Sequence, residues 1–110
     1  MSTEITINAQ ILDGNLGSGW KDPYNVALRY SQALETEFRR HALAAFPEAE
    51  VIVDIDVKRN ASGATRAPSV RVVVGGALEY SPELDRSIAE AVNETWAVWV
   101  NSAEAAMLAD

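Results

Sequence analysis

The sequence contains no cysteine and only one histidine, His41. Without cysteine the chain has no disulfide framework and no thiolate metal site, as is typical of a reducing compartment. His41 has no evident base or nucleophile partner, so it predicts no catalytic site. No stretch approaches the roughly 18 apolar residues of a membrane span, and "MSTEITINAQ" lacks the basic and apolar regions of a signal peptide. We therefore expect a cytoplasmic protein that does not enter a membrane.

Basic residues are also scarce, with 9 against 16 acidic residues and a net charge of -7. The acidity lies mainly between Ala77 and Asp110, where seven acidic residues accompany one basic residue. Nucleic-acid binding needs a cationic surface, so we do not expect direct binding unless one small basic segment acts alone. That segment contains Lys58, Arg59, Arg66 and Arg71. It has no aromatic side chain to stack on a base, and a solvated loop is the simpler interpretation.

The 110 residues, of which 48% are apolar, predict one domain over residues 1–110 with a buried core. Apolar and polar residues alternate in segments 5–11, 51–58 and 70–74, which is the period of a half-buried strand. Asp22-Pro23 and Ser81-Pro82 each offer an N-cap followed by proline at the first helical position. The first helix should reach about Phe46. The second should end near residue 101 or continue through "AEAAML".

The predicted order is strand, helix, strand, strand, helix. This order predicts an α+β two-layer sandwich, in which both helices cover one face of a three-stranded antiparallel sheet. Segments 51–58 and 70–74 should form a hairpin with a long loop. In that hairpin Arg71 would pair with Asp54 or Asp56 on the open face of the sheet.

Three glycines occur in "GNLGSGWKDPY", residues 14–24, and raise the question of a phosphate site. Gly14 and Gly19 have the spacing of a P-loop, but Trp20 occupies the position of the required lysine. The dinucleotide fingerprint also fails, because the glycines have the wrong order and no parallel βαβ unit is expected to follow. We therefore predict a flexible connection and no cofactor. Trp20 itself either folds back onto the core or anchors a partner.

Asp54 and Asp56 lie two residues apart on one strand, so their carboxylates share a face at a spacing of about 7 Å. A divalent ion would need a third acid, and the sequence offers no evident one. Two solvated carboxylates near Lys58 and Arg71 are the simpler interpretation. We therefore predict no metal site and no catalytic residues.

The second predicted helix contains "WAVWV", residues 96–100, whose apolar side chains cover most of the helix circumference. Such a segment either belongs entirely to the core or leaves Val98 on a homodimer or partner interface. Glu83, Glu90 and Glu94 lie on the same helix. An acidic face beside exposed apolar side chains is suited to a basic protein surface, although it can also be a solvated face that keeps the protein soluble.

These features predict a small acidic, non-enzymatic binding protein that acts by protein–protein contact through Trp20, Glu83, Glu90, Glu94 and Val98. In type, though not in any motif, it is similar to small, acidic, cysteine-free phage or bacterial inhibitors of nucleic-acid-handling complexes, such as the anti-CRISPR proteins. Two alternatives remain. One is a structural homodimer formed through sheet edges or "WAVWV", and the other is a small metal-dependent enzyme that uses Asp54 and Asp56.

Overall fold

A computed structural model describes residues 2–17 and 19–109 of the chain. Its elements, in order, are β1 (Thr3–Leu12), η1 (Asp13–Asn15), α1 (Pro23–Ala45), β2 (Glu50–Lys58), β3 (Ser69–Val74), β4 (Ala77–Glu79), α2 (Pro82–Val100) and α3 (Ala103–Leu108). The α+β class is confirmed. The 3-10 turn η1, the short strand β4 and the separate helix α3 add to the predicted order.

The two long helices begin where the sequence places them. The Asp22 side chain accepts a hydrogen bond from the backbone N–H of Asn25, and Ser81 accepts one from Leu84 in the same way. In each helix a proline occupies the first turn. Backbone N–H groups there have no partner within the helix, so the N–H that proline lacks is not needed. The chain does not continue as one helix through "AEAAML", because Ser102 caps the new helix α3.

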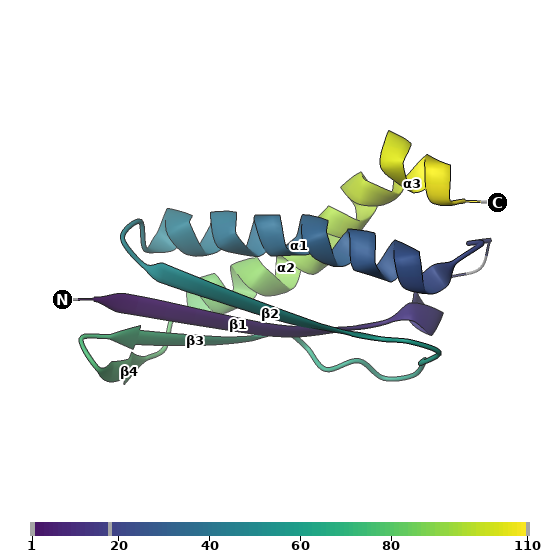
Figure 1. The fold of residues 1–110 in the computed structure, drawn as a ribbon. Coiled ribbons are helices and arrows are strands. Elements are labelled where there is room, and N and C mark those ends of the chain that lie inside the picture. Colours follow the sequence, from purple (N-terminus) through teal and green to yellow (C-terminus); the bar gives the residue numbers. More distant parts are fainter. Residues whose placement is uncertain (1, 18, 110) are drawn as a thin grey trace.

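The sheet has four strands in the order β2-β1-β3-β4 and is mixed, so the predicted three-stranded antiparallel sheet is wrong (Figure 1). The central strand β1 pairs in parallel with β2, with Ile5 opposite Val51, and antiparallel with β3, with Ile7 opposite Val70. The alternation of β2 misled the prediction because an edge strand with one solvated face has the same pattern as an antiparallel strand.

Three further expectations fail because β1 lies between β2 and β3 and pairs in parallel with β2. First, β2 and β3 form no hairpin, because β1 lies between them. Second, Arg71 lies opposite Thr6 and not opposite an aspartate, while Asp56 pairs with Lys58 at 3.0 Å. Third, β1, α1 and β2 do form a parallel βαβ unit. Only the order of the glycines therefore still disfavours a dinucleotide site.

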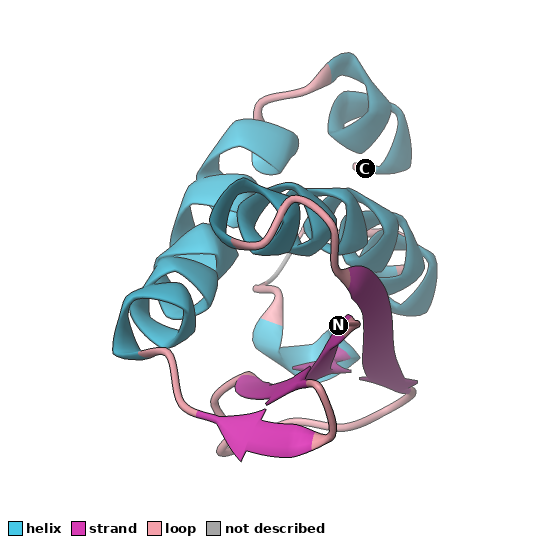
Figure 2. Ribbon diagram, turned by 90° about the vertical axis from the view of Figure 1, so that its left-hand side faces the viewer, coloured by secondary structure: helices cyan, strands magenta, loops and turns pink. Residues whose placement is uncertain are grey.

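Helices α1 and α2 cover the same face of the sheet, as predicted (Figures 1 and 2). The 23 residues of α1 span about 34 Å and the ten of β1 about 33 Å, so one helix covers the full length of the central strand. The core between the layers includes Ile5, Ile7, Val26, Leu34, Phe38, Val72 and Ile88. The opposite face is open and exposes Asn8, Asp54, Asp56, Lys58 and Arg71, as expected.

The connection from β2 to β3 crosses the end of β1, because β3 pairs on the far side of that strand. Here residues 13–15 bind residues 60–65, and we call this arrangement the loop clamp. The Asp13 carboxylate accepts hydrogen bonds from the backbone N–H groups of Asn60 (2.9 Å) and Ala61 (3.0 Å). Asn15 donates to the Gly63 carbonyl and to Thr65 Oγ1, and accepts from the Gly63 N–H.

The loop clamp answers the question raised by the first glycine. The N–H of Gly14 donates to the Ala61 carbonyl at 2.7 Å, and a Cβ at position 14 would lie 2.6 Å from that oxygen. A side chain does not fit at that distance. The hydrogen bonds from Asn60 and Ala61 also hold the pKa of Asp13 below its usual value. This part of the glycine segment is therefore tied down, and the prediction of a flexible connection is wrong here.

Candidate binding groove between helices α1 and α2

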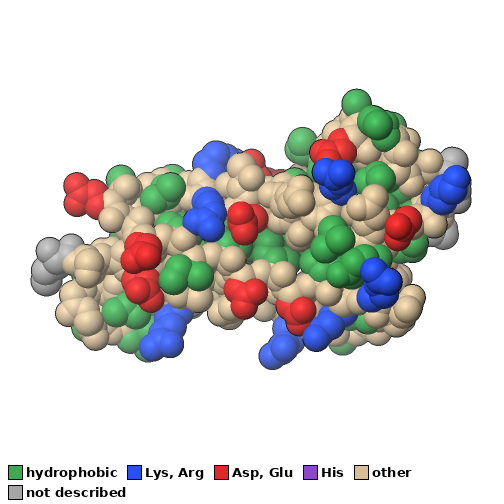
Figure 3. All heavy atoms as spheres, viewed as in Figure 1, with side chains coloured by type: hydrophobic (Ala, Val, Ile, Leu, Met, Phe, Trp, Pro, Cys, Tyr) green, Lys and Arg blue, Asp and Glu red, His purple; other side chains and the backbone are tan. Residues whose placement is uncertain are grey.

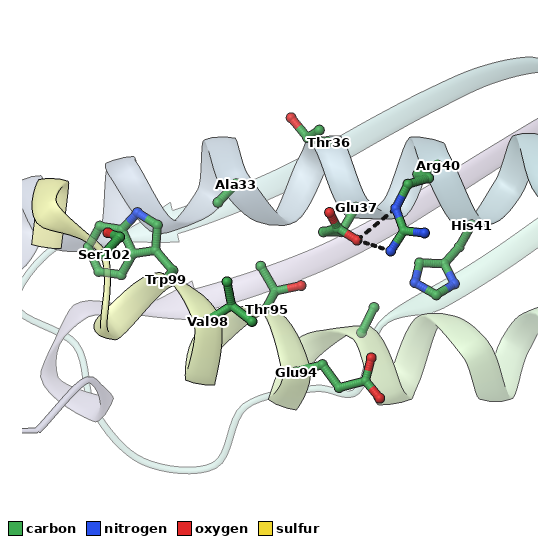
Figure 4. A pocket seen from close by; sticks show the side chains of 11 residues that line it. Ala33, Thr36, Glu37, Arg40, His41, Glu94, Thr95, Val98, Trp99 and Ser102 are labelled. Atoms are coloured by element: carbon green, nitrogen blue, oxygen red, sulfur yellow. Dashed lines mark hydrogen bonds and ion pairs between the residues drawn. The ribbon is translucent and has the colours of Figure 1, made fainter.

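A groove lies between α1 and α2, and Figure 4 shows its lining from close by. Its volume is about 470 Å³. Helix α1 contributes Ala33, Thr36, Glu37, Arg40 and His41, while Ala91, Glu94, Thr95, Val98, Trp99 and Ser102 come from α2 and the residues after it. Small alanine side chains on both helices leave the space, and buried Trp99 forms part of its floor near one end. The groove thus has an apolar floor and a polar rim.

The charges on the rim are not all balanced. Glu37 and Arg40 form an ion pair on α1, with Arg40 Nε 3.0 Å from a Glu37 carboxylate oxygen (Figure 4). The carboxylates of Glu37 and Glu94 both raise the pKa of Arg40 above its usual value, and Glu37 has the larger effect. Glu94 itself forms no ion pair among the described residues. Its carboxylate is therefore available to a cation from outside the molecule.

His41 contacts the other helix through a hydrogen bond between its Nδ1 and Ser87 Oγ. Within the part of the chain that the structure describes, no carboxylate hydrogen-bonds the imidazole. A serine nucleophile needs a base that a third group orients, and this pair lacks such a group. We interpret the contact as a tie between α1 and α2 at one end of the groove. No sequence pattern links Ser87 to His41, which lie 46 positions apart.

The predicted partner-binding residues of α2 do not form one site. Glu94 and Val98 both line the groove, and Val98 is 76% exposed. Glu90 is exposed one turn before Glu94 but does not line the groove. Glu83 lies in the first turn of α2, about 16 Å along the helix axis from Glu94, in a shallow hollow with Phe46 and Tyr80. The structure thus brings together Glu94 and Val98, with Glu90 beside them.

Trp20 points inward. Its ring is half-buried against Trp96 (6.5 Å between centroids) and Trp99 (6.2 Å), and its Nε1 donates to the Leu16 carbonyl. Its backbone also forms an isolated bridge with Ala109 beyond α3. Tyr30 completes the cluster, 5.0 Å from Trp96. Trp20 therefore packs against Trp99, which forms part of the groove floor, and does not line the groove itself. Its role in partner binding stays a prediction.

Trp99 joins the aromatic cluster to the groove. Its side chain is 5% exposed, and its Nε1 has no hydrogen-bond partner among the described residues. Tyr30, by contrast, donates its hydroxyl hydrogen to the Val92 carbonyl at 2.7 Å. Burial raises the pKa of Tyr30 to about 12. The cluster is thus an extension of the core, half-buried at Trp20 and Trp96, which meets the groove at Trp99.

The four cations of the basic segment have different surroundings. Lys58 pairs with Asp56, and the Arg59 guanidinium lies over the Tyr24 ring at 4.2 Å. Arg66 lines a hollow of about 460 Å³ on the open sheet face, and Arg71 is exposed on β3. Two of the four therefore already have partners within the chain, which reduces the cationic surface available to a phosphate backbone.

Asp54 and Asp56 share that hollow with Asn8, Gln10 and Arg66. Across residues 2–17 and 19–109, no three histidine, aspartate or glutamate side chains come together in a way that could hold a metal ion. A guanidinium and two amides in place of a third carboxylate give a polar hollow of mixed charge.

The fold and the groove define an α+β protein whose four-stranded mixed sheet supports a groove between two helices. Comparisons with protein-family models, with curated proteins and with solved structures find no match. Among the described residues no helix is both long enough and apolar enough to cross a membrane.

Most of the groove lining was not predicted, because only Glu94 and Val98 of its eleven residues belong to the predicted binding set. Ala33, Glu37 and Arg40 lie on α1, and no periodicity within one helix shows which residues of another helix it meets. The available signal was the pair of small residues, Ala33 and Ala91, at positions near the apolar stripe of each helix. Small residues there permit close approach of two helices, but they do not specify a pairing.

Proposed function

We propose that this protein is a non-enzymatic binding protein that docks on a basic surface of another protein through the groove between α1 and α2. One observation carries the proposal. Glu94, which lacks an ion-pair partner among the described residues, and the exposed side chain of Val98 lie together over an apolar floor formed by Ala33, Ala91 and Trp99. At such a site the unpaired carboxylate can bind a cation, and the apolar floor can accept an inserted apolar side chain.

The groove has room for side chains that a partner inserts. Its volume of about 470 Å³ lies within the usual range of small-molecule pockets, about 300–1,000 Å³. The proposed partner presents a lysine or arginine to Glu94 and an apolar side chain to Trp99 from the same segment of its surface. Glu90, one turn away on the exposed side of α2, extends the acidic contact.

The distribution of charge supports a basic partner. The acidic excess lies in the last third of the chain, and most of its carboxylates belong to α2. Like-signed charges on one element raise the association rate with a surface of opposite sign. Basic surfaces that receive nucleic acid have this chemistry, so we propose inhibition of a nucleic-acid-handling complex as the biological role.

A selection from a random peptide display library tests the groove directly. The wild-type protein should enrich peptides that combine lysine or arginine with a large apolar residue. The same library should show no such enrichment on Glu94→Lys/Val98→Asp, a variant altered only on the rim of the groove. The same peptides emerging from both selections would place the binding site elsewhere and contradict the proposal.

Charge reversal then tests the mechanism with a selected peptide. We expect Glu90→Lys/Glu94→Lys to weaken binding by about tenfold or more and to flatten its dependence on salt concentration. The matched control is Glu48→Lys/Glu79→Lys, which makes the same change in net charge at exposed positions outside α2. Equal affinities of the two double variants in titration calorimetry would defeat the proposal.

A further inference from the structure

A second surface is independent of the groove. Strand β2 forms one edge of the sheet and pairs only with β1 among the described residues. It has nine residues, "EVIVDIDVK", with no proline and no bulge in its register with β1. A long edge strand presents a row of free backbone N–H and C=O groups, which another strand can pair with.

The residues of β2 that direct these groups outward can be identified. The N–H of Gly75 donates to the Ser2 carbonyl. The backbone N–H and C=O groups of the even-numbered residues of β1 therefore point toward β3, and those of the odd-numbered residues point toward β2. In the parallel register of Ile5 with Val51, the even-numbered residues of β2 then bind β1. The backbone N–H and C=O groups of the odd-numbered residues of β2 point outward, away from the sheet. The Val51 carbonyl agrees, because it accepts a hydrogen bond from the Arg39 side chain at 2.7 Å.

We propose that a second copy of this chain binds here, with the two β2 strands antiparallel about a twofold axis at Asp54. In this register Val51 pairs with Val57 of the second copy and Val53 pairs with Ile55, all through outward-facing backbone groups. All nine residues of the strand then take part. The two four-stranded sheets become one continuous sheet of eight strands. Each carbonyl has two lone pairs, so Val51 can keep its bond to Arg39.

Charge complementarity selects this register. Glu50 and Lys58 are the two end residues of β2. In the dimer Glu50 of each copy lies opposite Lys58 of the other, so the contact forms twice. They form a non-hydrogen-bonded pair, in which the Cα atoms of opposite residues are only about 4.5 Å apart and side chains interact most closely. Moving the axis by one residue would place Glu50 opposite Asp56, or Asp54 opposite Asp56. Those registers set carboxylates against each other.

The side chains of β2 that face the helices support the same occupant. Val51, Val53, Ile55 and Val57 are each only partly buried, although they pack against the core. Figure 3, which views the molecule from the β2 side, shows apolar side chains among charged ones of both signs. A second copy extends the sheet past this row and covers it. Two contacts oppose the pairing. Asp54 meets its own copy on the axis, and the Lys58 ammonium, 3.0 Å from Asp56 in the same chain, must be shared with Glu50 of the second copy.

Sedimentation equilibrium between about 1 µM and 1 mM tests the proposal on the full chain. The wild type should dimerise reversibly in this range. Glu50→Lys and Lys58→Glu should each weaken the dimer by about tenfold, and the exchange of charge in Glu50→Lys/Lys58→Glu should restore it to within about threefold. Asp54→Asn should strengthen the dimer, because it removes the only like-charge contact on the axis.

The control is Glu79→Lys on β4, which makes the same change of charge at the other edge of the sheet. A wild type that stays monomeric throughout overturns the proposal. So does a dimer that Glu50→Lys weakens no more than Glu79→Lys does, since its interface would lie elsewhere. A failure of the charge exchange to restore the dimer overturns the register.

Amide hydrogen exchange tests the same geometry without a substitution. The N–H groups of Val51, Val53, Ile55 and Val57 should exchange more slowly as concentration rises, because dimerisation buries them in new hydrogen bonds. Those of Ile52, Asp54 and Asp56 already bind β1 and should change little. Equal protection of both sets, or of neither, contradicts the pairing.

Discussion

At the end of the sheet where β1 and β2 finish, side chains hold the loops together, while at the opposite end the turns depend mainly on backbone hydrogen bonds. Asp13 and Asn15 bind residues 60–65 in the loop clamp, and Trp20 packs nearby on Trp99. At the other end Gly75 donates to Ser2, and Leu78 and Tyr80 are 68% and 77% exposed.

Topology explains the difference. At the first end the chain must pass from β2 across β1 to β3, and residues 59–68 make that crossing. Ordering a long connection costs conformational entropy, which the hydrogen bonds of the loop clamp offset. At the other end β3 and β4 are neighbours and a two-glycine turn is enough. The fold thus concentrates specific side-chain chemistry where the connection is longest.

The largest effect should come from Gly14→Ala. The added Cβ would meet the Ala61 carbonyl at 2.6 Å and force two backbone segments apart, so we expect a loss of about 3 kcal/mol in unfolding free energy. Gly76→Ala is the control at the other end, where a Cβ meets nothing but φ is +85°. It should cost about 1 kcal/mol. Equal losses in urea unfolding would remove the contrast between the two ends.

Trp20→Ala should rank second. The indole is half-buried between Trp96 and Trp99 and donates to Leu16, so its loss should cost about 2 kcal/mol. Because Trp20 does not line the groove, a peptide bound there should lose little affinity at temperatures where the variant stays folded. A large loss of binding with unchanged stability would instead make Trp20 a partner anchor.

Tyr30→Phe should cost about 1 kcal/mol at neutral pH, because it removes the hydrogen bond to the Val92 carbonyl. The pKa of Tyr30 is about 12, against an ordinary value of 10.0. In the unfolded chain the phenol therefore ionises first as pH rises, and ionisation favours the unfolded state. The advantage of the wild type over the variant should shrink between pH 10 and 12 in denaturant titrations. A constant difference across that window would contradict the burial of the hydroxyl.

The smallest effect should come from Tyr80→Ser at the exposed end. The side chain is 77% exposed, so the unfolding free energy should change by less than about 0.5 kcal/mol. If thermal unfolding showed a loss above 1 kcal/mol in unfolding free energy, this end of the sheet would also depend on side-chain contacts. The proposed difference between the two ends would then be wrong.

Local signals predicted most of the elements but not their pairing. Asp22-Pro23 and Ser81-Pro82 mark helix starts by chemistry that acts within one turn, and the alternation of β1, β2 and β3 follows from one buried face. Nothing local separates an edge strand of a mixed sheet from an antiparallel strand. The place of β1 between β2 and β3 therefore went unpredicted. With only three residues, β4 is too short to show a period.

Only a small part of the candidate groove could be predicted, for a related reason. Glu94 and Val98 were found because both lie outside the apolar stripe of one helix. Glu37 and Arg40 belong to a second helix, and only the packing of α1 on α2 brings them to the same place. The loop clamp likewise joins residues about fifty positions apart, and no short sequence motif predicts these hydrogen bonds.

All three tryptophans of the chain lie in one cluster, and one of them forms part of the groove floor. The protein therefore carries its own optical reporter. Its intrinsic fluorescence comes almost wholly from the region beneath the groove, and the close stacking of Trp96 and Trp99 should give a distinctive near-ultraviolet circular dichroism band. An occupant of the groove should alter both signals without any added label, whereas an event confined to β4 should leave them unchanged.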